Sequence, residues 1–299
     1  MQFVTFEIGD RGQLGLLVGD KVIRLDWLDS SLPMDMVSFI ALGLPALEQA
    51  AVAFDRWACG QLPESVTLPL ADVRLRAPVL SPSKIVAVGL NYMDHCRETN
   101  IKPPDWPILF AKFPSSVIGP GERIEWGPAL TTQADYEAEL AVVIGRRARH
   151  IPAQKAFDVV FGYTCANDVT ARDMQKNDRQ WVRGKSLDTF CPLGPALVTK
   201  DEVPHPDRLH IACRVNGETR QQSNTAEMIF NIPSLIEFIT RACTLLPGDV
   251  ILTGTPHGTG AFRQPPIFLR DGDIVQVEIE SIGVLQNRCR EDLKRLSNP

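Results

Sequence analysis

The sequence predicts an α+β fold that is rich in β-strands. Most apolar runs are short and end at glycine, proline or other turn-forming residues, which is typical of strands. Only a few longer stretches show apolar residues at helical spacing. Strands and helices do not alternate regularly, so the pattern does not indicate a parallel βαβ sheet. At 299 residues, the chain has room for one large domain or two ordinary ones.

Residues 1–78 are expected to form a small N-terminal domain of short strands and a helix. Residues 3–25 alternate apolar runs with turn signals at Gly9–Gly12 and Gly19–Asp20, which predicts an antiparallel meander. Apolar residues then recur at helical spacing over about 34–57. A proline-bearing stretch from Pro63 to Pro82 follows, and we interpret it as the linker to the larger domain.

The larger domain is expected to span residues 79–299 and to begin with a buried strand at 84–89, followed by a short helix over about 92–99. Further apolar runs predict strands near 108–113, 138–144, 159–166, 195–199, 209–215, 249–253 and 273–280, and helices near 170–178 and 232–244. We expect the first of these two helices to start at Thr170, whose spacing to Asp173 resembles a capping box.

Composition and charge point to a globular protein with a small-molecule partner. Hydrophobic residues make up 44% and charged residues 22%, which is ordinary for a globular chain. The formal net charge of −5 and the lack of a basic run argue against a nucleic-acid surface. No apolar run approaches the roughly 18 residues that a membrane-spanning helix needs. The seven scattered cysteines form no CxxC motif and, without a signal-peptide pattern, indicate reduced thiols in the cytoplasm.

Two glutamates one residue apart, Glu137 and Glu139, stand at the start of the apolar run that predicts the strand at 138–144. Because side chains alternate along a strand, both carboxylates point to the same face. A third acid, Asp168, ends the run Gly162–Asp168, where another strand gives way to a helix. Alternatively, the two glutamates are solvent-facing residues at a strand end, and the aspartate caps a helix or forms a turn.

Like charges side by side at the mouth of a hydrophobic strand are costly unless a cation offsets their repulsion. If Glu137, Glu139 and Asp168 converge, they form an all-oxygen site, which favours Mg²⁺ or Mn²⁺ over zinc. Three protein ligands leave about three positions in octahedral coordination for water or for two oxygens of a 2-oxo acid. The pattern therefore predicts a catalytic rather than a structural metal site.

His95 and Glu98 are three residues apart in the predicted helix over 92–99, so they share a face and are close enough to hydrogen-bond. A carboxylate beside an imidazole raises the basicity of the imidazole. Such a dyad is able to activate water as a general base near neutral pH. The alternative is an exposed ion pair on a helix surface, which is common and individually weak.

Two glycine-containing stretches carry further candidates. Gly184–Ser186 is not a phosphate loop, since Arg179 stands where that motif needs a glycine. Lys185 in this stretch either polarises a substrate carbonyl or binds a carboxylate, or it is an ordinary solvated lysine. The loop 253–260 either brings backbone amides to an anionic ligand or is a tight structural turn, and we assign its His257 no role.

Taken together and in order, these stretches resemble the fumarylacetoacetate hydrolase family over about residues 82–292. The matching segments are Gly89–Glu98, Tyr136–Gly145, Gly162–Asp173, Gly184–Pro195, Val215–Gly217, Asn224–Phe230 and Pro247–Pro256. Their number and order argue against coincidence. The resemblance implies a mixed β-sandwich roll as the catalytic domain, usually paired in a homodimer. Longer relatives carry a small N-terminal domain ahead of it.

The resemblance also implies roles for individual residues. It places Mg²⁺ or Mn²⁺ on the three acids, and it assigns His95 and Glu98 to a short helix that folds over the site. It predicts substrate contacts for four side chains: Lys185, Arg172, Gln175 and Thr255. The chain departs from the family pattern at His257 and Thr259, where many relatives have a smaller residue and a valine, so the choice of substrate stays open.

These features predict a hydrolase that cleaves a C–C bond of a β-diketo acid such as an acylpyruvate. The metal and Lys185 would stabilise the enolate that cleavage leaves, while water activated by His95 and Glu98 attacks the distal carbonyl. Decarboxylation of a 2-oxo acid such as oxaloacetate is the first alternative, because it needs enolate stabilisation but no attacking water. Isomerisation of an unsaturated 2-hydroxy dioate and a non-catalytic binding role are the others.

Overall fold

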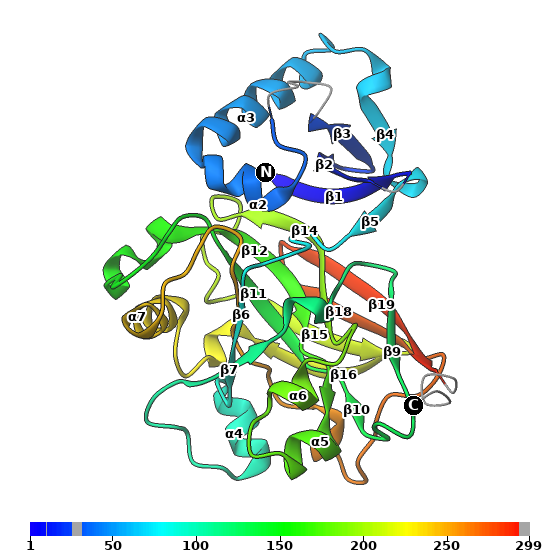
Figure 1. Ribbon diagram of the computed structural model, residues 1–299, viewed down its shortest axis with the longest axis vertical. Coiled ribbons are helices and arrows are strands. Elements are labelled where there is room, and N and C mark those ends of the chain that lie inside the picture. The colour runs from blue at the N-terminus through cyan, green and yellow to red at the C-terminus, as the bar shows by residue number, and fades with distance from the viewer. Residues whose placement is uncertain (10, 26–31, 293–299) are drawn as a thin grey trace.

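The computed structural model describes residues 1–9, 11–25 and 32–292. The N-terminal segment, up to about residue 76, stacks along the long axis of the molecule on a larger body formed by the rest of the chain (Figure 1). Asp10, which belongs to the first expected turn, lies outside the described residues. The division between residues 78 and 79 stays a prediction, because one sheet runs through both parts.

The N-terminal part contains the expected meander and a helical segment that breaks in two at Gly43, where φ is +67°. Its elements are β1 (Gln2–Ile8), β2 (Arg11–Val18), β3 (Lys21–Arg24), α2 (Met36–Leu42), α3 (Leu44–Ala58), β4 (Thr67–Pro69), β5 (Arg74–Arg76) and 3₁₀ turns at Glu64–Val66 and Leu70–Asp72. The proline-bearing stretch is not simply a linker, because β4 pairs with β3 and β5 pairs with β1. Prolines are compatible with such short strands at a sheet edge.

The larger body contains most of the strands and four short helices among the described residues. Its elements are β6 (Ile85–Gly89), α4 (Met93–Thr99), β7 (Ile108–Lys112), β8 (Val117–Ile118), β9 (Arg123–Trp126), β10 (Ala134–Asp135), β11 (Ala138–Ile144), β12 (Val160–Asn167), β13 (Thr170–Ala171), α5 (Arg172–Asn177), α6 (Val182–Lys185), β14 (Cys191–Thr199), β15 (His210–Val215), β16 (Glu218–Asn224), α7 (Ile232–Ala242), β17 (Val250–Leu252), β18 (Ile274–Ile279) and β19 (Gly283–Glu291). Further 3₁₀ turns cover Pro114–Ser116, Ala153–Val159, Thr225–Glu227 and Gly260–Phe262.

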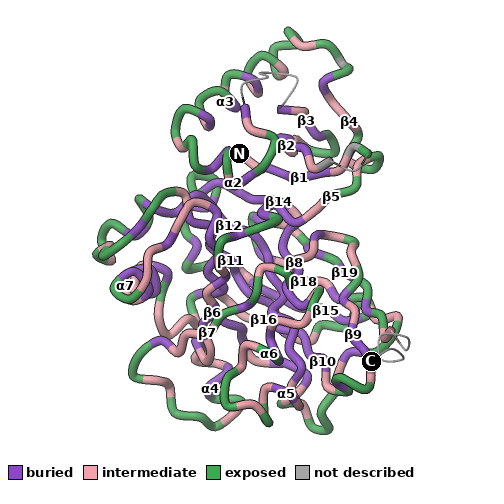
Figure 2. Tube along the Cα trace, viewed as in Figure 1, coloured by how far each residue is buried: buried purple, intermediate pink, exposed green. Residues whose placement is uncertain are grey.

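The main sheet has the strand order β4-β3-β2-β1-β14-β12-β11-β17-β6-β7, with β5 paired to β1 and β8 to β14. The join between the two parts of the chain is antiparallel, with Gln2 opposite Val198 and Phe3 opposite Leu197. Strands β11 and β12 lie in the middle of this sheet, and all of their residues are buried (Figure 2). A fully apolar run such as Leu140–Ile144 is what a strand covered on both faces requires.

A second sheet, with the order β16-β15-β18-β19-β9, packs face to face against β11 and β12. Side chains from both sheets share one hydrophobic cluster, which includes Leu140, Val142, Val277 and Leu285. The two layers form the β-sandwich core, and the α+β, β-rich fold class is therefore confirmed.

The helix expected from Thr170 starts two residues later than predicted. Thr170 lies in β13, where its hydroxyl donates to the backbone oxygen of Asp168, and Ala171 precedes α5 without a side-chain cap. Asp173 does not close a capping box, because its carboxylate accepts from Thr131 Oγ1 at 2.7 Å. The capping spacing was misleading because the backbone of Thr170 pairs with Asp135 in a strand and the Asp173 carboxylate has its own partner, Thr131.

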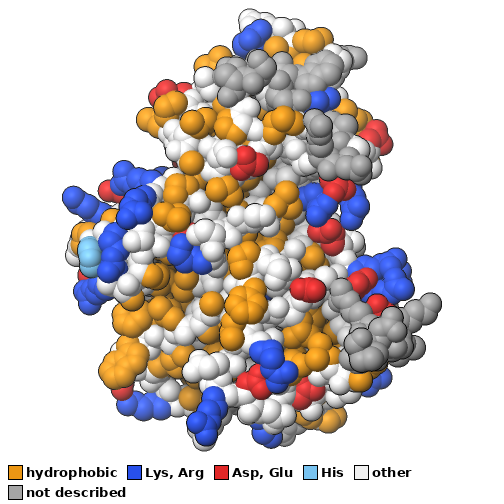
Figure 3. Space-filling model, viewed as in Figure 1, with side chains coloured by type: hydrophobic (Ala, Val, Ile, Leu, Met, Phe, Trp, Pro, Cys, Tyr) orange, Lys and Arg blue, Asp and Glu red, His pale blue; other side chains and the backbone are white. Residues whose placement is uncertain are grey.

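On the face shown in Figure 3, neither positive nor negative side chains dominate among the described residues. Lysine and arginine side chains are scattered among acidic and hydrophobic ones (Figure 3). Within the described ranges no single helix is long and apolar enough to cross a membrane, although the bent pair of α2 and α3, at 106°, passes that test together.

Candidate active site

The three acids predicted to bind a metal lie together at the end of β11 and β12. Glu139 is in β11, Glu137 immediately precedes that strand, and Asp168 immediately follows β12. The backbone N–H of Asp168 donates to the backbone oxygen of Glu137 at 2.9 Å, so the pairing of β11 with β12 continues up to the acids. One oxygen from each carboxylate lies within 4.8 Å of the others, and all three residues are buried. We call these three residues the carboxylate cluster.

Two buried lysines contact the carboxylate cluster. Lys185 Nζ lies 2.7 Å from both Glu137 Oε2 and Asp168 Oδ2. Lys112 Nζ, from the end of β7, lies 2.6 Å from Asp168 Oδ1 and also donates to the backbone oxygens of Val169 and Lys185. Lys112 was missed by the sequence analysis, because its apolar flanks give no sign that its ammonium turns inward.

Arg172 extends the same network rather than lying free in the cavity. Its Nε donates to Asp135 Oδ2 at 2.8 Å, and an Nη atom lies 2.6 Å from Glu137 Oε1. A second Nη donates to Gln175 Oε1 at 3.0 Å, so the two predicted substrate contacts are joined. Asp135 also accepts from the backbone N–H of Gly260 and was not singled out in the sequence.

The charges of this network favour a cation beside Glu139. Burial would raise the pKa of Glu137, but Lys185 and Arg172 outweigh it and hold that pKa well below its usual range. Burial, reinforced by Asp168 and Glu137, instead raises the pKa of Glu139 well above its usual value. Burial opposes the charge of Lys185, yet its two carboxylate partners keep its pKa raised. The lysine is therefore a cation at neutral pH.

Glu139 differs from the other two acids in having no ion pair with any described lysine, arginine or histidine. Its Oε2 accepts from the backbone N–H of Gly254 at 2.7 Å. With Asp135 included, four acids face three cations, and Glu139 is the acid that has no cationic partner of its own. This donor set therefore fits a divalent ion, since hard cations take oxygen ligands.

Helix α4 places the predicted dyad above the carboxylate cluster. His95 Nδ1 lies 3.1 Å from Glu98 Oε2, and the His95 ring packs edge-on against Phe262 at 5.3 Å. Burial alone would raise the pKa of Glu98, but His95 and the backbone N–H of Gly258 lower it overall. Because Nδ1 faces the carboxylate, Nε2 is the ring nitrogen available to a reactant.

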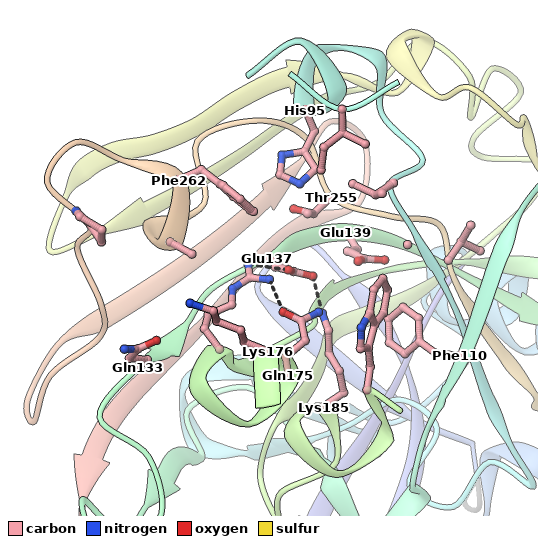
Figure 4. Close-up of a pocket in the computed structure, with 18 of the residues that line it drawn as sticks. His95, Phe110, Gln133, Glu137, Glu139, Gln175, Lys176, Lys185, Thr255 and Phe262 are labelled. Carbon is pink, nitrogen blue, oxygen red and sulfur yellow. Dashed lines mark hydrogen bonds and ion pairs between the residues drawn. The ribbon is translucent and has the colours of Figure 1, made fainter. Parts of the chain in front are cut away.

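The cavity between these groups has a volume of about 600 Å³ and is open on one side. His95 lies on one side, Glu137 and Glu139 on the other, and Thr255 lies between them (Figure 4). Thr255 Oγ1 accepts from Gln221 Nε2 at 2.8 Å, which orients the hydroxyl. All nine predicted site residues thus lie in or beside one cavity, and their roles stay predictions.

One wall of the cavity is aromatic. Phe110 and Trp181 meet edge to face at 5.4 Å, and Lys185 Nζ lies 5.1 Å from the centre of the Phe110 ring. Gly89 makes room for this wall, because a Cβ atom there would lie 2.6 Å from Trp181 Cζ3. The cavity therefore combines a charged floor with an apolar side.

Another pair missed in the sequence lies behind the dyad. His257, which was assigned no role, places its Nδ1 3.0 Å from Asp94 Oδ2 on α4. The two residues are 163 positions apart, so no local spacing could have indicated the pairing.

Residues 84–290 match the family model described as fumarylacetoacetate (FAA) hydrolase C-terminal. The chain is 49% identical to the human oxaloacetate tautomerase FAHD2A, mitochondrial, over 279 residues, which are 92% of this chain and 86% of the relative. It is 42% identical to the oxaloacetate tautomerase YisK of Bacillus subtilis over 300 residues, which are 96% of this chain and 99% of the relative.

Solved structures show the same fold. The fumarylacetoacetate hydrolase EaFAH of the psychrophile Exiguobacterium antarcticum is 38% identical, with a TM-score of 0.85 over 98% of this chain and 100% of that one. A maleylpyruvate hydrolase from Sphingobium sp. SYK-6, in complex with manganese(II) ion and pyruvate, is 31% identical, with a TM-score of 0.78 over 97% of this chain and 99% of that one. By sequence and by structure, this chain belongs to the fumarylacetoacetate hydrolase family of enzymes.

Proposed function

We propose that this enzyme catalyses the keto–enol tautomerisation of oxaloacetate or a closely similar 2-oxo diacid. The observation that carries the proposal is the likeness to oxaloacetate tautomerases over more than nine-tenths of the chain, from a human and from a Bacillus relative. The enol of oxaloacetate is an unsaturated 2-hydroxy dioate, so this activity falls within the isomerase alternative of the sequence analysis. The comparisons favour the oxaloacetate alternatives over the acylpyruvate hydrolase that was placed first.

The reaction moves one proton and breaks no carbon–carbon bond. In the keto form, a proton leaves the carbon beside the keto group, and a proton is added to the keto oxygen to give the enol. His95 is suited to carry that proton, because Glu98 accepts from Nδ1 at 3.1 Å and leaves Nε2 free as the base. The negative charge of Glu98 then stabilises the imidazolium that forms.

The carboxylate cluster would hold a divalent ion, Mg²⁺ or Mn²⁺. The manganese ion in the maleylpyruvate hydrolase neighbour supports such a site here. When bound, the ion would supply positive charge that stabilises developing negative charge on the keto oxygen. Lys185, Lys112 and Arg172 already pair with Glu137 and Asp168, which leaves Glu139 as the acid of the cluster without a cationic partner.

Substrate contacts of Lys185, Arg172, Gln175 and Thr255 stay proposals. Gln175 holds Arg172, and Gln221 orients the Thr255 hydroxyl. All four side chains line the cavity. Arg172 lines the cavity, and a substrate carboxylate there would share its guanidinium with Glu137 and Gln175.

A three-arm assay of purified protein with Mg²⁺ or Mn²⁺ tests the proposal. One arm follows loss of the enol absorbance of oxaloacetate, the second pyruvate formation from oxaloacetate, and the third cleavage of acylpyruvates. We expect acceleration in the first arm without matching pyruvate formation. If pyruvate forms as fast as the enol disappears, the enzyme is a decarboxylase and the tautomerase proposal is wrong. If an acylpyruvate is turned over faster than oxaloacetate, the activity is the C–C hydrolysis that the sequence analysis placed first.

His95→Ala identifies the proton carrier in the same assay. We expect the rate to fall by roughly 10²–10⁴, which is what a positioned general base contributes. His205→Ala, which removes an exposed imidazole elsewhere, is the matched control and should keep the wild-type rate. An unchanged rate in His95→Ala would remove the dyad from the mechanism.

Location and assembly stay proposals as well. The cytoplasmic location expected from the sequence stays a proposal, because the name of the human relative includes the word mitochondrial. A homodimer without nucleic-acid or membrane partners remains our expectation. Sedimentation velocity at several protein concentrations tests the dimer, and fractionation of the source cells tests the location.

A further inference from the structure

The loop 253–260 joins the carboxylate cluster to α4 through its backbone. Gly254 N–H donates to Glu139 Oε2 at 2.7 Å. Four residues later, Gly258 N–H donates to both oxygens of Glu98, at 3.0 and 3.2 Å. Gly258 has φ +96°, and a Cβ atom there would lie 2.2 Å from a backbone oxygen, so only glycine is accommodated. The loop therefore links the position of α4 to that of the carboxylate cluster.

His257 adds a side-chain tie between this loop and α4. Asp94 Oδ2 accepts from His257 Nδ1 at 3.0 Å, and Asp94 Oδ1 accepts from the His257 backbone N–H at 3.3 Å. Ser223 Oγ also donates to Asp94. Asp94 and Glu98 are four residues apart, so they share one face of the helix. Two carboxylates of α4 thus hold two consecutive residues of the loop.

The pair of His257 and Asp94 also gives the second acid of α4 an imidazole partner beside the dyad. Asp94 and Glu98 are like charges one helical turn apart, which destabilises a helix unless each is compensated. Glu98 is paired with His95 at 3.1 Å, and Asp94 is paired with His257 at 3.0 Å. The Asp94 side chain is only 14% exposed, so solvent screens its charge weakly.

We propose that His257 is a positioning residue that, through Asp94, holds α4 in place so that His95 faces the carboxylate cluster. The inference rests on the proposed tautomerase function. His95 lines the cavity, whereas the His257 side chain is 44% exposed at the surface. His257 therefore acts through α4 and not on the reactant.

Steady-state kinetics at saturating Mg²⁺ test this role in three variants. His257→Ala removes the donor to Asp94, His257→Asn keeps an N–H near the position of Nδ1, and Arg97→Ala removes the exposed ion pair with Glu227 from the same helix. We expect His257→Ala to lower kcat about tenfold with KM within about twofold, because a hydrogen bond to a charged group is lost. His257→Asn should recover most of kcat, and Arg97→Ala should match wild type.

Hydrogen exchange gives a readout that does not depend on turnover. In the metal-loaded protein, the amides of the peptide over residues 93–99 should exchange faster in His257→Ala than in wild type, with His257→Asn close to wild type. If wild type shows no tautomerase activity, the proposed function fails while the exchange result still decides the positioning role. Wild-type kcat and exchange in His257→Ala, or equal losses in the Ala and Asn variants, would overturn the inference.

Discussion

The carboxylate cluster and helix α4 face each other across one cavity, but they are held in place in different ways. The cluster lies at the ends of β11 and β12 in the centre of the main sheet, and the Asp168 side chain is 0% exposed. Helix α4 has seven residues, and the Glu98 side chain of its dyad is 22% exposed. Side-chain hydrogen bonds to the loop 253–260 tie the helix down.

The difference separates two tasks that an enzyme of this kind has to perform. Strand register fixes the ligand oxygens, so their spacing cannot change without moving the core. The imidazole of His95 lies on a peripheral helix, where a few side-chain hydrogen bonds set its position. Substitutions in the cluster should therefore change ion binding and, through the ion, turnover, whereas substitutions around α4 should change turnover with small effects on stability.

The largest effect is expected from Glu139→Gln, which removes one acid of the carboxylate cluster and leaves α4 unchanged. Turnover should fall roughly thousandfold, because the contribution of a metal ion is worth several kcal/mol. The metal-free variant should nevertheless be at least as stable as wild type, because glutamine keeps an acceptor for Gly254 and removes repulsion from Asp168 and Glu137. Activity assays and urea unfolding in chelator measure both effects.

A chelator should likewise abolish wild-type turnover, and added Mg²⁺ or Mn²⁺ should restore it. The matched control is Glu237→Gln, whose carboxylate pairs with Arg241 on α7 far from the cavity. A fall in the stability of metal-free Glu139→Gln would show that the acid is compensated without an ion.

Lys112→Met should have the next largest effect. It removes a fully buried cation from Asp168 and leaves a buried carboxylate with one partner fewer. Breaking a buried pair in this way costs about 3–5 kcal/mol of the free energy of unfolding. Because a divalent ion would replace the lost charge, Mg²⁺ should stabilise the variant more than it stabilises wild type in urea unfolding.

Lys102→Met is the control for that variant, since Lys102 is 82% exposed and pairs with Asp105 at 3.5 Å. Its free energy of unfolding should stay within about 0.5 kcal/mol of wild type. Equal stabilisation of Lys112→Met and wild type by Mg²⁺ would argue that the ion and the lysine do not share Asp168.

Gly89→Ala changes the aromatic wall of the cavity and leaves both the carboxylate cluster and α4 unchanged. The new methyl group overlaps Trp181, so the indole has to move, at an overpacking cost of about 1–3 kcal/mol. We expect a raised KM for 2-oxo acids with bulky substituents and little change for oxaloacetate. The double variant Gly89→Ala/Trp181→Ala should relieve the overlap, and a KM that stays raised there would exclude the indole as the cause.

The smallest effect is a pH dependence of stability on the α4 side. The folded-state pKa of Glu98 is lowered from 4.5, so its contribution is present above pH 4.5 and is lost as pH falls through the folded pKa. Glu98→Gln should therefore be less stable than wild type by on the order of 1 kcal/mol at neutral pH. The gap should close in more acidic urea titrations, and a gap that widens there would reverse the assigned direction.

Local patterns were enough for the parts of the site that local geometry controls. The alternation at Glu137 and Glu139 predicted two acids that converge, and the three-residue spacing of His95 and Glu98 predicted their contact. The end of a strand predicted the neighbourhood of Asp168. For the two glutamates and for the dyad, the period of the strand or helix determines the distance, whereas Asp168 reaches the glutamates through the pairing of β12 with β11.

Contacts made across the fold were not predictable in this way. Lys112 reaches Asp168 over 56 positions of sequence, and His257 reaches Asp94 over 163. Such pairs depend on the strand order, which places β7 and the loop after β17 beside residues far away in the chain. The short strands β4 and β5 were missed because prolines obscured them, although tertiary pairing stabilises them.

The pairing of β1 with β14 has a consequence for shortened forms of the protein. Strand β1 covers the backbone of β14 near Leu197 and Val198, both fully buried. A fragment limited to residues 84–290 would expose these N–H and C=O groups as an unpaired sheet edge, which could pair with the same edge of another molecule. The first strand of the chain thus also protects the enzyme from self-association through its sheet.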